Sequence, residues 1–295
     1  MRKFILGTDW SSDCDDVLAL RLFCRAHKKG EIKLLGVNVD DNVENAVRSL
    51  GAFLTSEGCP DIPVGFDRTA KRVCFNPRYQ KRMSLLPSPY TSNEDAEPSL
   101  TFYRRLLATS DEAVEIVEIG YTQSLAALLK SKPDDVSPLS GRELVETKVK
   151  KLWIMAGKWD EQGGKEHNFD GTRATKKGGA YICKNWPTPI TFLGWEVSHD
   201  VCIGADLPEG DVARNALIDY GCDPAVGRAG WDPMLARLAL VGDEEKAGYR
   251  CVKGKAKLSA LTGKNRFVPG EGNCAYVVKT QPDDHYKAVI NELLK

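Results

Sequence analysis

The sequence predicts an α/β fold with an open, mostly parallel sheet and helices on both faces. Three observations carry this prediction. Short apolar runs alternate with stretches of helical periodicity, Gly or Pro bounds most of the runs, and polar residues gather just after them. Strand, helix and strand in this order form the unit of parallel sheets, and the crossover of such a unit is right-handed.

The first strand-helix-strand unit lies at the N-terminus. Phe4–Leu6 is a short apolar run that predicts a strand, and the residues from Asp16 to Phe23 have the pattern of a buried helix that ends near Gly30. The apolar run Ile32–Val39 predicts the second strand. This unit is expected to place two parallel strands in one sheet.

The same alternation continues beyond residue 110. Val114–Ile119 predicts a strand that leads into a helix over Ser124–Leu129, and Val149–Met155 and Ile190–Leu193 predict further strands. Residues 248–295 are expected to add a small β-rich patch and a terminal helix.

The chain of 295 residues is expected to form a single domain, 1–295, because one compact α/β domain can reach roughly 250 residues or more. Residues 68–98 interrupt the alternation with a stretch rich in charge, Pro and Ser. A long segment without periodicity in a compact enzyme is often a lid or a binding loop. A plain surface insertion is an equal alternative.

The balance of charges excludes some classes of partner. Lys plus Arg and Asp plus Glu both number 41, so no general attraction to nucleic acid or to an anionic membrane is expected. The apolar run at the N-terminus is too short for a signal peptide, and no run reaches the roughly 18 residues that span a bilayer. A small molecule is the expected partner.

The nine cysteines are scattered along the chain and none belongs to a C-x-x-C pair. Their odd number and their spacing favour neither a disulfide framework nor a zinc site. A reducing setting is therefore expected, which predicts a cytoplasmic protein.

Polar residues follow the expected strands, at the edge where an open α/β sheet binds its ligand. These candidate site residues are Asp9, Asp13, Asp15 and Asp16 after the first run; Asn38, Asp40, Asp41 and Asn42 after the second; Thr122 and Gln123 after the third; and Glu166, His167, Asn168, Asp170 and Asp232 further along.

The first of these loops carries four carboxylates within eight residues, from Asp9 to Asp16. At short range they repel one another strongly, and a helix N-terminus offsets only about 0.3 to 1 kcal/mol per exposed charge. A bound cation removes this repulsion. Oxygen ligands on flexible loops favour a hard ion, and calcium more than magnesium. The alternative is a set of N-capping carboxylates on a solvated loop.

The segment FILGTDWSSDCDDVLAL, residues 4–20, resembles the N-terminal signature of the inosine-uridine-type nucleoside hydrolases, in which a strand precedes Asp-x-Asp-Pro-Gly-x-Asp-Asp and a helix. Further matches follow in the family's order as far as Leu240: Asp61–Val64, Ile119–Ala126, Glu166–Asn168, Pro189–Thr191 and Trp231–Pro233. The resemblance implies a Rossmann-like nucleoside hydrolase fold and a hydrolase that splits the N-glycosidic bond of ribonucleosides with a calcium ion.

The resemblance also implies the metal ligands. It makes Asp9 a calcium ligand that takes a proton from the metal-bound water, as the catalytic base, and it makes Asp16 a bidentate ligand. The backbone carbonyl of Thr122 and the carboxylate of Asp232 complete the implied set.

The first loop is two residues longer than the family pattern when the strands are aligned. Counting back from Asp16 without gaps would put Ser11 at the position of the base, whereas aligning the strand selects Asp9. Asp13 then lies in the inserted part. Replacing a metal ligand, holding ribose and capping the helix all stay open as its role.

The same resemblance implies a ribose pocket. Its members in this chain are Asp15, Met155, Glu166 and Asn168. Asn168 is also counted among the catalytic residues. The family's asparagine after the second strand corresponds to Asn38 or to Asn42. Asn38 and Asp13 are further candidate contacts of the substrate.

Trp231 stands where many family members carry a His that protonates the departing base. Purine-selective members have Trp there, and stacking on the base, worth about 1 to 3 kcal/mol, eases protonation of its ring nitrogen. Trp231 is therefore expected to bind the base and act in catalysis on purine nucleosides, with Trp10 or Trp159 as a second flanking ring. The alternative is a Trp that fills the core. His167 and His199 receive no role.

Two other functions fit the sequence. A magnesium-dependent phosphohydrolase could use the acidic loop, although Ser11 stands two residues after Asp9, where such enzymes usually have a second Asp. A non-catalytic nucleoside- or sugar-binding protein could have kept the pocket and lost turnover. The expected assembly is a homodimer or a homotetramer.

Overall fold

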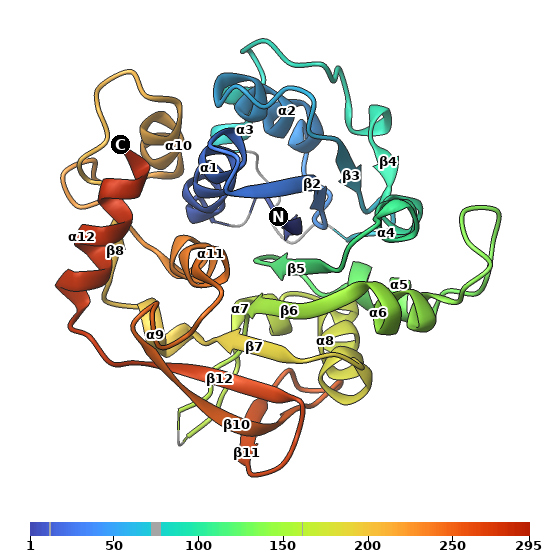
Figure 1. The fold of residues 1–295 in the computed structure, drawn as a ribbon. Coiled ribbons are helices and arrows are strands. Elements are labelled where there is room, and N and C mark those ends of the chain that lie inside the picture. Colours follow the sequence, from blue (N-terminus) through green and yellow to red (C-terminus); the bar gives the residue numbers. More distant parts are fainter. Residues whose placement is uncertain (12, 72–77, 161) are drawn as a thin grey trace.

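The computed structural model describes residues 1–11, 13–71, 78–160 and 162–295, and it confirms the predicted fold class (Figure 1). A sheet of ten strands has the order β11-β10-β12-β7-β6-β5-β1-β2-β3-β4, and β8 and β9 form a second, two-stranded sheet. From β12 to β4 every pairing in the large sheet is parallel, whereas β10 pairs antiparallel with both β11 and β12. The strands are β1 (Arg2–Thr8), β2 (Ile32–Val39), β3 (Val64–Phe66), β4 (Glu97–Pro98), β5 (Val114–Glu118), β6 (Val149–Met155), β7 (Ile190–Leu193), β8 (Cys202–Ile203), β9 (Arg228–Ala229), β10 (Tyr249–Leu258), β11 (Asn265–Pro269) and β12 (Cys274–Lys279).

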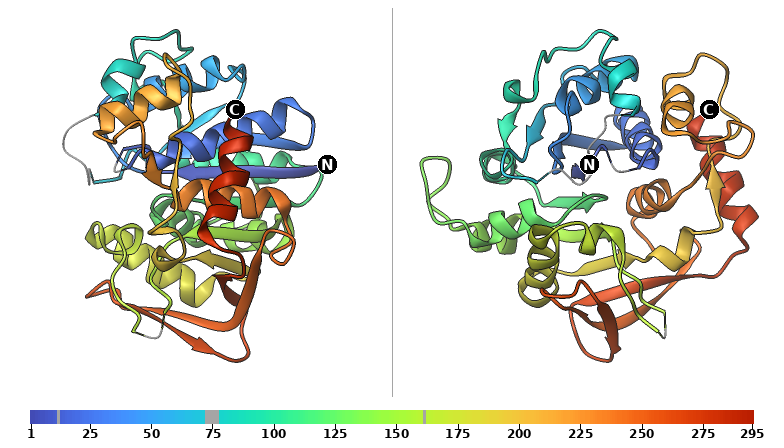
Figure 2. Two further views of the ribbon diagram at one scale, coloured as in Figure 1. Left: turned by 90° about the vertical axis from the view of Figure 1, so that its left-hand side faces the viewer. Right: turned by 180° about the vertical axis from the view of Figure 1, so that it is seen from behind.

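Helices cover both faces of the sheet. Buried side chains of α1, α2 and α11 belong to one apolar core, and those of α4, α5 and α8 belong to a second core on the other face. The C-terminal helix α12 packs against α1 and α11 (Figure 2). The helices are α1 (Asp15–Lys28), α2 (Ala46–Ser56), α3 (Tyr79–Met83), α4 (Ser99–Thr109), α5 (Gln123–Lys130), α6 (Gly141–Lys148), α7 (His167–Asp170), α8 (Arg173–Asn185), α9 (Trp195–Ser198), α10 (Val212–Tyr220), α11 (Trp231–Val241), α12 (Asp283–Leu294) and the 3-10 helix η1 (Asn93–Asp95).

The central strands are buried on both faces, which explains why they appear in the sequence as continuous apolar runs. In β1, Phe4 and Leu6 belong to the first core, while Ile5 between them belongs to the second. In β6, Trp153 belongs to the first core and Ile154 to the second. Each strand therefore joins the two helical layers.

The C-terminal part completes the main sheet. The expected β-rich patch is its antiparallel end, formed by β10, β11 and β12, and α12 is the expected terminal helix. None of the helices in the described ranges has the length and apolar character needed to cross a membrane.

Part of the stretch 68–98 is built into this architecture. Helix α3 packs against α2 and α10, and β4 pairs with β3 at the edge of the sheet. Residues 72–77, at the centre of the expected lid or insertion, lie outside the described residues.

The strand order creates a switch point beside β1. The chain runs from β1 through β2 and β3 to β4 on one side, and then returns to β5 on the other side of β1. Open α/β sheets bind ligands in the crevice that such a reversal leaves at the carboxyl ends of the strands. The C-terminal ends of β1 and β5 are therefore the place to look for a site.

Candidate active site

A cavity of about 380 Å³ opens beside this switch point, and its size suits a small molecule. Most of the predicted site residues line it, but Asn38, Asp40, Asp41, Asn42, Thr122, Gln123 and Asp170 do not. The lining residues are Asp9, Asp13, Asp15, Asp16, Ile119, Met155, Glu166, His167, Asn168, Trp195, Tyr220, Arg228, Trp231 and Asp232.

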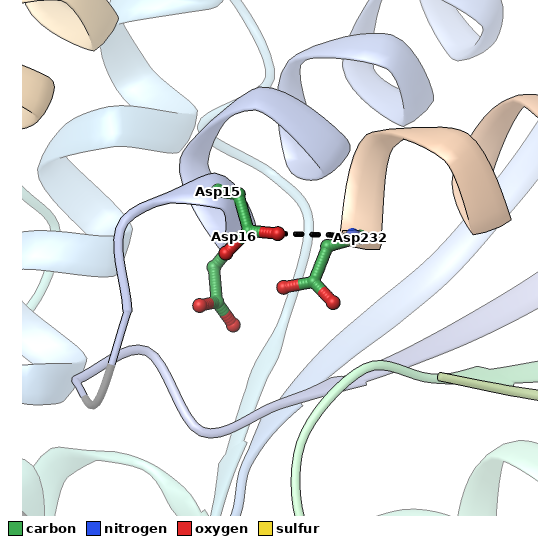
Figure 3. A group of neighbouring side chains, drawn as sticks. All are labelled: Asp15, Asp16 and Asp232. Atoms are coloured by element: carbon green, nitrogen blue, oxygen red, sulfur yellow. Dashed lines mark hydrogen bonds between the residues drawn. The ribbon is translucent and has the colours of Figure 1, made fainter. Parts of the chain in front are cut away.

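Three carboxylates form the acidic group of the cavity: Asp15 and Asp16 at the start of α1, and Asp232 at the start of α11 (Figure 3). One oxygen from each lies within 4.8 Å of the others. The backbone N–H of Asp232 donates to Oδ2 of Asp15 at 3.0 Å, which ties the two helix starts together.

The charges of the acidic group are poorly compensated by the protein alone. Burial raises the pKa of all three carboxyl groups well above the ordinary value, and repulsion between the carboxylates raises it further. The positive ends of the two helix dipoles stabilise these negative charges by only about 1 kcal/mol each. A buried donor set made of oxygen alone fits a hard divalent cation such as calcium or magnesium. The acidic group could therefore hold such an ion.

Asp9 is buried at the carboxyl end of β1 and lines the same cavity. After burial, its charge is the largest cause that raises the pKa of Asp16, which lines the same cavity. Asp9 is nevertheless not a member of the group of three, in which Asp15 takes the place expected for it. The structure thus brings Asp16 and Asp232 together as predicted and adds Asp15, the expected ribose contact.

Trp10 anchors the first loop through its buried side chain. Its backbone has a positive φ of 48°, and its buried indole packs against Phe53 and Tyr79 with ring centroids 5.7 Å away in both cases. The indole Nε1 donates to Ser49 at 3.0 Å. Trp10 therefore does not flank a base, and it fixes the backbone beside Asp9 instead.

The remaining metal and sugar candidates lie just outside the cavity. Thr122 precedes α5, and its carbonyl accepts the N–H of Ala126 at 3.0 Å. Asn38 is fully buried and accepts a hydrogen bond from Ser99 through Oδ1. Asn42 does not line the cavity either.

The predicted sugar-binding residues do lie together. Glu166 accepts the backbone N–H groups of Gly157 and Asn168, both at 2.8 Å, while burial raises the pKa of its carboxyl group. The side-chain amide of Asn168 donates to the carbonyls of Ile119 and Met155 at 3.0 and 2.9 Å. These bonds fix both side chains at the ends of β5 and β6, beside the acidic group.

Comparison with solved structures identifies this architecture. An inosine-uridine preferring nucleoside hydrolase from Bacillus anthracis has a TM-score of 0.71 at 18% identity, with 100% of this chain and 99% of that chain covered. A plant nucleoside hydrolase has a TM-score of 0.71 at 15% identity, covering 99% and 98% of the two chains. The chain has the nucleoside hydrolase fold.

A purine-preferring ribonucleoside hydrolase from Gardnerella vaginalis has the same fold, with a TM-score of 0.67 at 18% identity over 100% of this chain and 99% of that one. No protein-family model and no curated protein matches the sequence itself. The resemblance in the motifs is therefore confirmed as a resemblance in fold along the whole chain.

Asp13, in the insertion of the first loop, forms an ion pair within this nucleoside hydrolase fold. Arg228 of β9 donates through Nε to Oδ1 of Asp13 at 2.8 Å and through a second nitrogen to its other oxygen. Asp13 also accepts the N–H of Cys14 at 2.7 Å. The guanidinium of Arg228 lies 5.3 Å from the ring of Tyr220 and 5.5 Å from that of Trp231. The pair thus joins the acidic loop to the aromatic end of the cavity, which is formed by Trp195, Tyr220 and Trp231.

Trp231 lies at that aromatic end and is only partly buried. Its indole Nε1 donates to the carbonyl of Trp195 at 2.8 Å, which fixes the ring at the cavity wall. Trp195 and Tyr220 also line the cavity, whereas Trp159 is buried in the second core and donates to the carbonyl of Ala156. The rings available to a ligand beside Trp231 are therefore not the two expected from the sequence.

Ile119, His167, Trp195, Tyr220 and Arg228 are the lining residues to which sequence reasoning gave no role. One signal could have found Trp195, because it stands two residues after β7, at the carboxyl end of a central strand. Tyr220 and Arg228 follow from long-range packing of α10 and β9, which no local pattern indicates.

A second acidic pair lies behind the cavity. Asp40 follows β2, Glu118 ends β5, and their carboxyl groups are fully buried and close enough that the charge of Glu118 raises the pKa of Asp40. Asp40 also accepts the N–H of Tyr121 at 2.9 Å, and Glu118 accepts that of Gly120 at 3.1 Å. A Cβ at Gly7 would collide with the Glu118 carboxyl, so glycine in β1 makes room for this pair.

We expect the pair to make stability depend on pH. Burial raises the pKa of Glu118 from 4.5 to about 8. Between these values the folded state binds more protons than the unfolded state, so the free energy of unfolding falls as the pH rises, on the order of 5 kcal/mol in total. Glu118→Gln keeps the shape of the side chain and stays neutral at every pH. Urea unfolding at pH 5, 6.5 and 8 should show a flatter profile for this variant.

The matched control for this experiment is Glu112→Gln, which changes an exposed carboxylate just before the same strand. It should keep the wild-type profile. A Glu118→Gln profile parallel to that of the wild type would mean that the Glu118 proton is not responsible.

Proposed function

We propose that the chain hydrolyses the N-glycosidic bond of ribonucleosides, with a preference for purine nucleosides and with calcium in the acidic group. The observation that carries the proposal is that one cavity combines the acidic group, the sugar-binding pair Glu166 and Asn168, and the aromatic end around Trp231. These are the three parts that such a reaction needs: activation of water, a hold on the ribose, and help for the departing base.

Asp9 is the proposed base. A calcium ion in the acidic group would lower the pKa of a water molecule beside it. Asp9 is buried and lines the same cavity as Asp16, which supports a role in accepting the proton as this water attacks the anomeric carbon. Asp9 and the carbonyl of Thr122 are further candidate ligands, beside the three carboxylates of the acidic group.

Glu166 and Asn168 are proposed to hold the ribose, with Met155 against its apolar side and Asp15 near its hydroxyl groups. The backbone bonds that fix Glu166 and Asn168 set their geometry before the substrate arrives. Such preorganisation matters because the transition state has oxocarbenium character, and bonds to the sugar hydroxyls strengthen as charge develops.

The aromatic end is proposed to bind the base. Trp231 supplies the face of an indole, while Trp195 and Tyr220 line the same region. Stacking is stronger on larger rings, and this supports the preference for purines. Asp13 lines the cavity and is held by Arg228, so it is a further candidate contact of the substrate, whereas Asn38 does not line the cavity, bonds to Ser99 and is assigned to support of the site.

The test is a nucleoside panel. Inosine, adenosine, guanosine, uridine and cytidine are incubated with the full chain, first with a chelator and then with calcium or magnesium. We expect free base and ribose in equal amounts, faster with purines and with calcium. Thermal stabilisation by nucleosides without product would instead support a binding protein, and release of phosphate from nucleotides would support a phosphohydrolase.

The remaining expectations are part of the same proposal. We propose that the protein acts in the cytoplasm as a homodimer or a homotetramer, and light scattering of the purified chain measures its assembly.

A further inference from the structure

Two cysteines meet beside the acidic loop. Sγ of Cys14 lies 3.7 Å from Sγ of Cys222, although the two residues are 208 positions apart in the chain. Cys14 is fully buried between Asp13 and Asp15, directly before α1. Cys222 lies just after α10 and is only partly buried. The pair therefore joins the acidic loop to the segment that carries the aromatic end.

Cys222 can be reached by small solutes. It lines a second cavity of about 370 Å³, which shares Tyr220, Arg228 and Trp231 with the candidate active site. The contact with Cys14 and, to a smaller extent, the charge of Arg228 lower the pKa of the Cys222 thiol. An accessible thiol with thiolate character is the usual first target of a peroxide.

We propose that Cys14 and Cys222 form a site of reversible oxidation, at which a peroxide converts the two thiols into a disulfide. The Cys222 thiolate attacks one peroxide oxygen and the O–O bond breaks, which gives a sulfenic acid, and the departing hydroxide takes the proton that the Cys222 thiol had released and leaves as the first water. The Cys14 sulfur then attacks the Cys222 sulfur, the S–O bond breaks, and the hydroxyl leaves as a second water with the Cys14 proton. Two thiols and one peroxide thus give one disulfide and two waters.

Bond formation moves the acidic loop. The sulfurs are 3.7 Å apart and a disulfide needs about 2.05 Å, so they must approach by about 1.6 Å. Both neighbours of Cys14 are already bound to the opposite segment, Asp13 to Arg228 and Asp15 to the N–H of Asp232. The new bond therefore pulls on the residues that carry the acidic group.

The consequence for activity depends on the proposed function. A displacement of about 1 Å in a catalytic group can cost 10²-fold in rate. Oxidation is therefore expected to lower nucleoside turnover at least tenfold and to reduce the thermal stabilisation that calcium gives. Reduction with dithiothreitol should restore both.

The experiment uses the full chain with calcium, treated with hydrogen peroxide, quenched with catalase and alkylated. Mass spectrometry of tryptic peptides should find one cross-linked pair that contains Cys14 and Cys222, with turnover of inosine measured in parallel. Cys222→Ser should keep both turnover and calcium response after peroxide. Cys202→Ser, which changes another cysteine of the same cavity, should behave as the wild type.

The outcomes separate this proposal from the proposed function. If no nucleoside is cleaved, the cross-linked peptide and the calcium response still test the oxidation site. Absence of the cross-link in peroxide-treated wild type, or equal inactivation of Cys222→Ser, overturns the proposal. A cross-link that leaves turnover and calcium response unchanged overturns its effect on the acidic group.

Discussion

Asp9→Asn is expected to lower turnover of inosine by between about 10² and 10⁴-fold, the usual contribution of a general base, while part of the stabilisation by calcium persists through the three carboxylates of the acidic group. The reason is the position of Asp9, which lines the cavity and yet is not a member of the group formed by Asp15, Asp16 and Asp232. The asparagine keeps the shape of the side chain and cannot accept the proton. Steady-state kinetics and thermal unfolding with and without calcium measure the two effects.

Asp232→Asn is the companion variant and should lose both the turnover of inosine and the stabilisation by calcium. It removes one of the three buried carboxylates that burial and mutual repulsion destabilise, so the calcium-free variant should unfold at a higher temperature than the calcium-free wild type. Calcium should add little, whereas a wild-type site at 100 times its Kd gains about 2.7 kcal/mol.

Asp61→Asn, at an exposed position, is the control for both substitutions and should resemble the wild type. Equal loss of the calcium effect in Asp9→Asn and Asp232→Asn would show that Asp9 is a metal ligand as well as a base. Loss of the calcium effect in neither variant would contradict the metal site.

Trp231→Ala is expected to lower turnover of inosine roughly 10- to 100-fold and to leave turnover of nitrophenyl riboside almost unchanged. The indole at position 231 lines the cavity but cannot donate a proton to the base from Nε1, which bonds to the carbonyl of Trp195. Trp231 must then assist the departure of the base by stacking on it. Nitrophenolate needs no protonation to leave, so loss of the ring costs that substrate little. The comparison needs kcat/KM for both substrates.

Trp231→Phe is the matched control, because it keeps an aromatic face and removes the bond to Trp195. It should recover most of the inosine activity. Equal losses on both substrates in Trp231→Ala would mean that Trp231 acts in binding or packing only.

Local patterns were sufficient to predict most of the sheet. β2, β6 and β7 have the bounds of their apolar runs, because strands buried on both faces need a continuous apolar stretch. The edge of the sheet was less predictable. β10 carries Lys at alternate positions toward its end, and only its pairing with β12 shows that it extends the main sheet.

The candidate site was predictable where it depends on strand ends. The rule that ligands bind after the strands selected Asp9, Asp16, Glu166 and Asn168, and all of them line one cavity. The rule fails where side chains meet across the fold. The bond between Asp13 and Arg228 spans 215 residues, and neither residue type predicts the other.

The fold also determines which aromatic side chains lie beside Trp231 in the cavity. Trp10 and Trp159 stand near motif residues in the sequence, yet each turns into a core, where Trp10 donates to Ser49 and Trp159 to the carbonyl of Ala156. Sequence proximity to a motif does not give the direction of a side chain.

The acidic group also bears on the order of events during synthesis. Its hydrogen bond between Asp15 and Asp232 spans 217 residues, so the N-terminal carboxylates leave the ribosome long before their partner exists. Contacts between such distant parts of a chain form late, and N-terminal segments fold first. Nascent chains that end before α11 therefore lack one carboxylate of the acidic group. If the acidic group holds calcium as proposed, the ion would stabilise only chains in which the starts of α1 and α11 have come together, and its uptake would report completed folding.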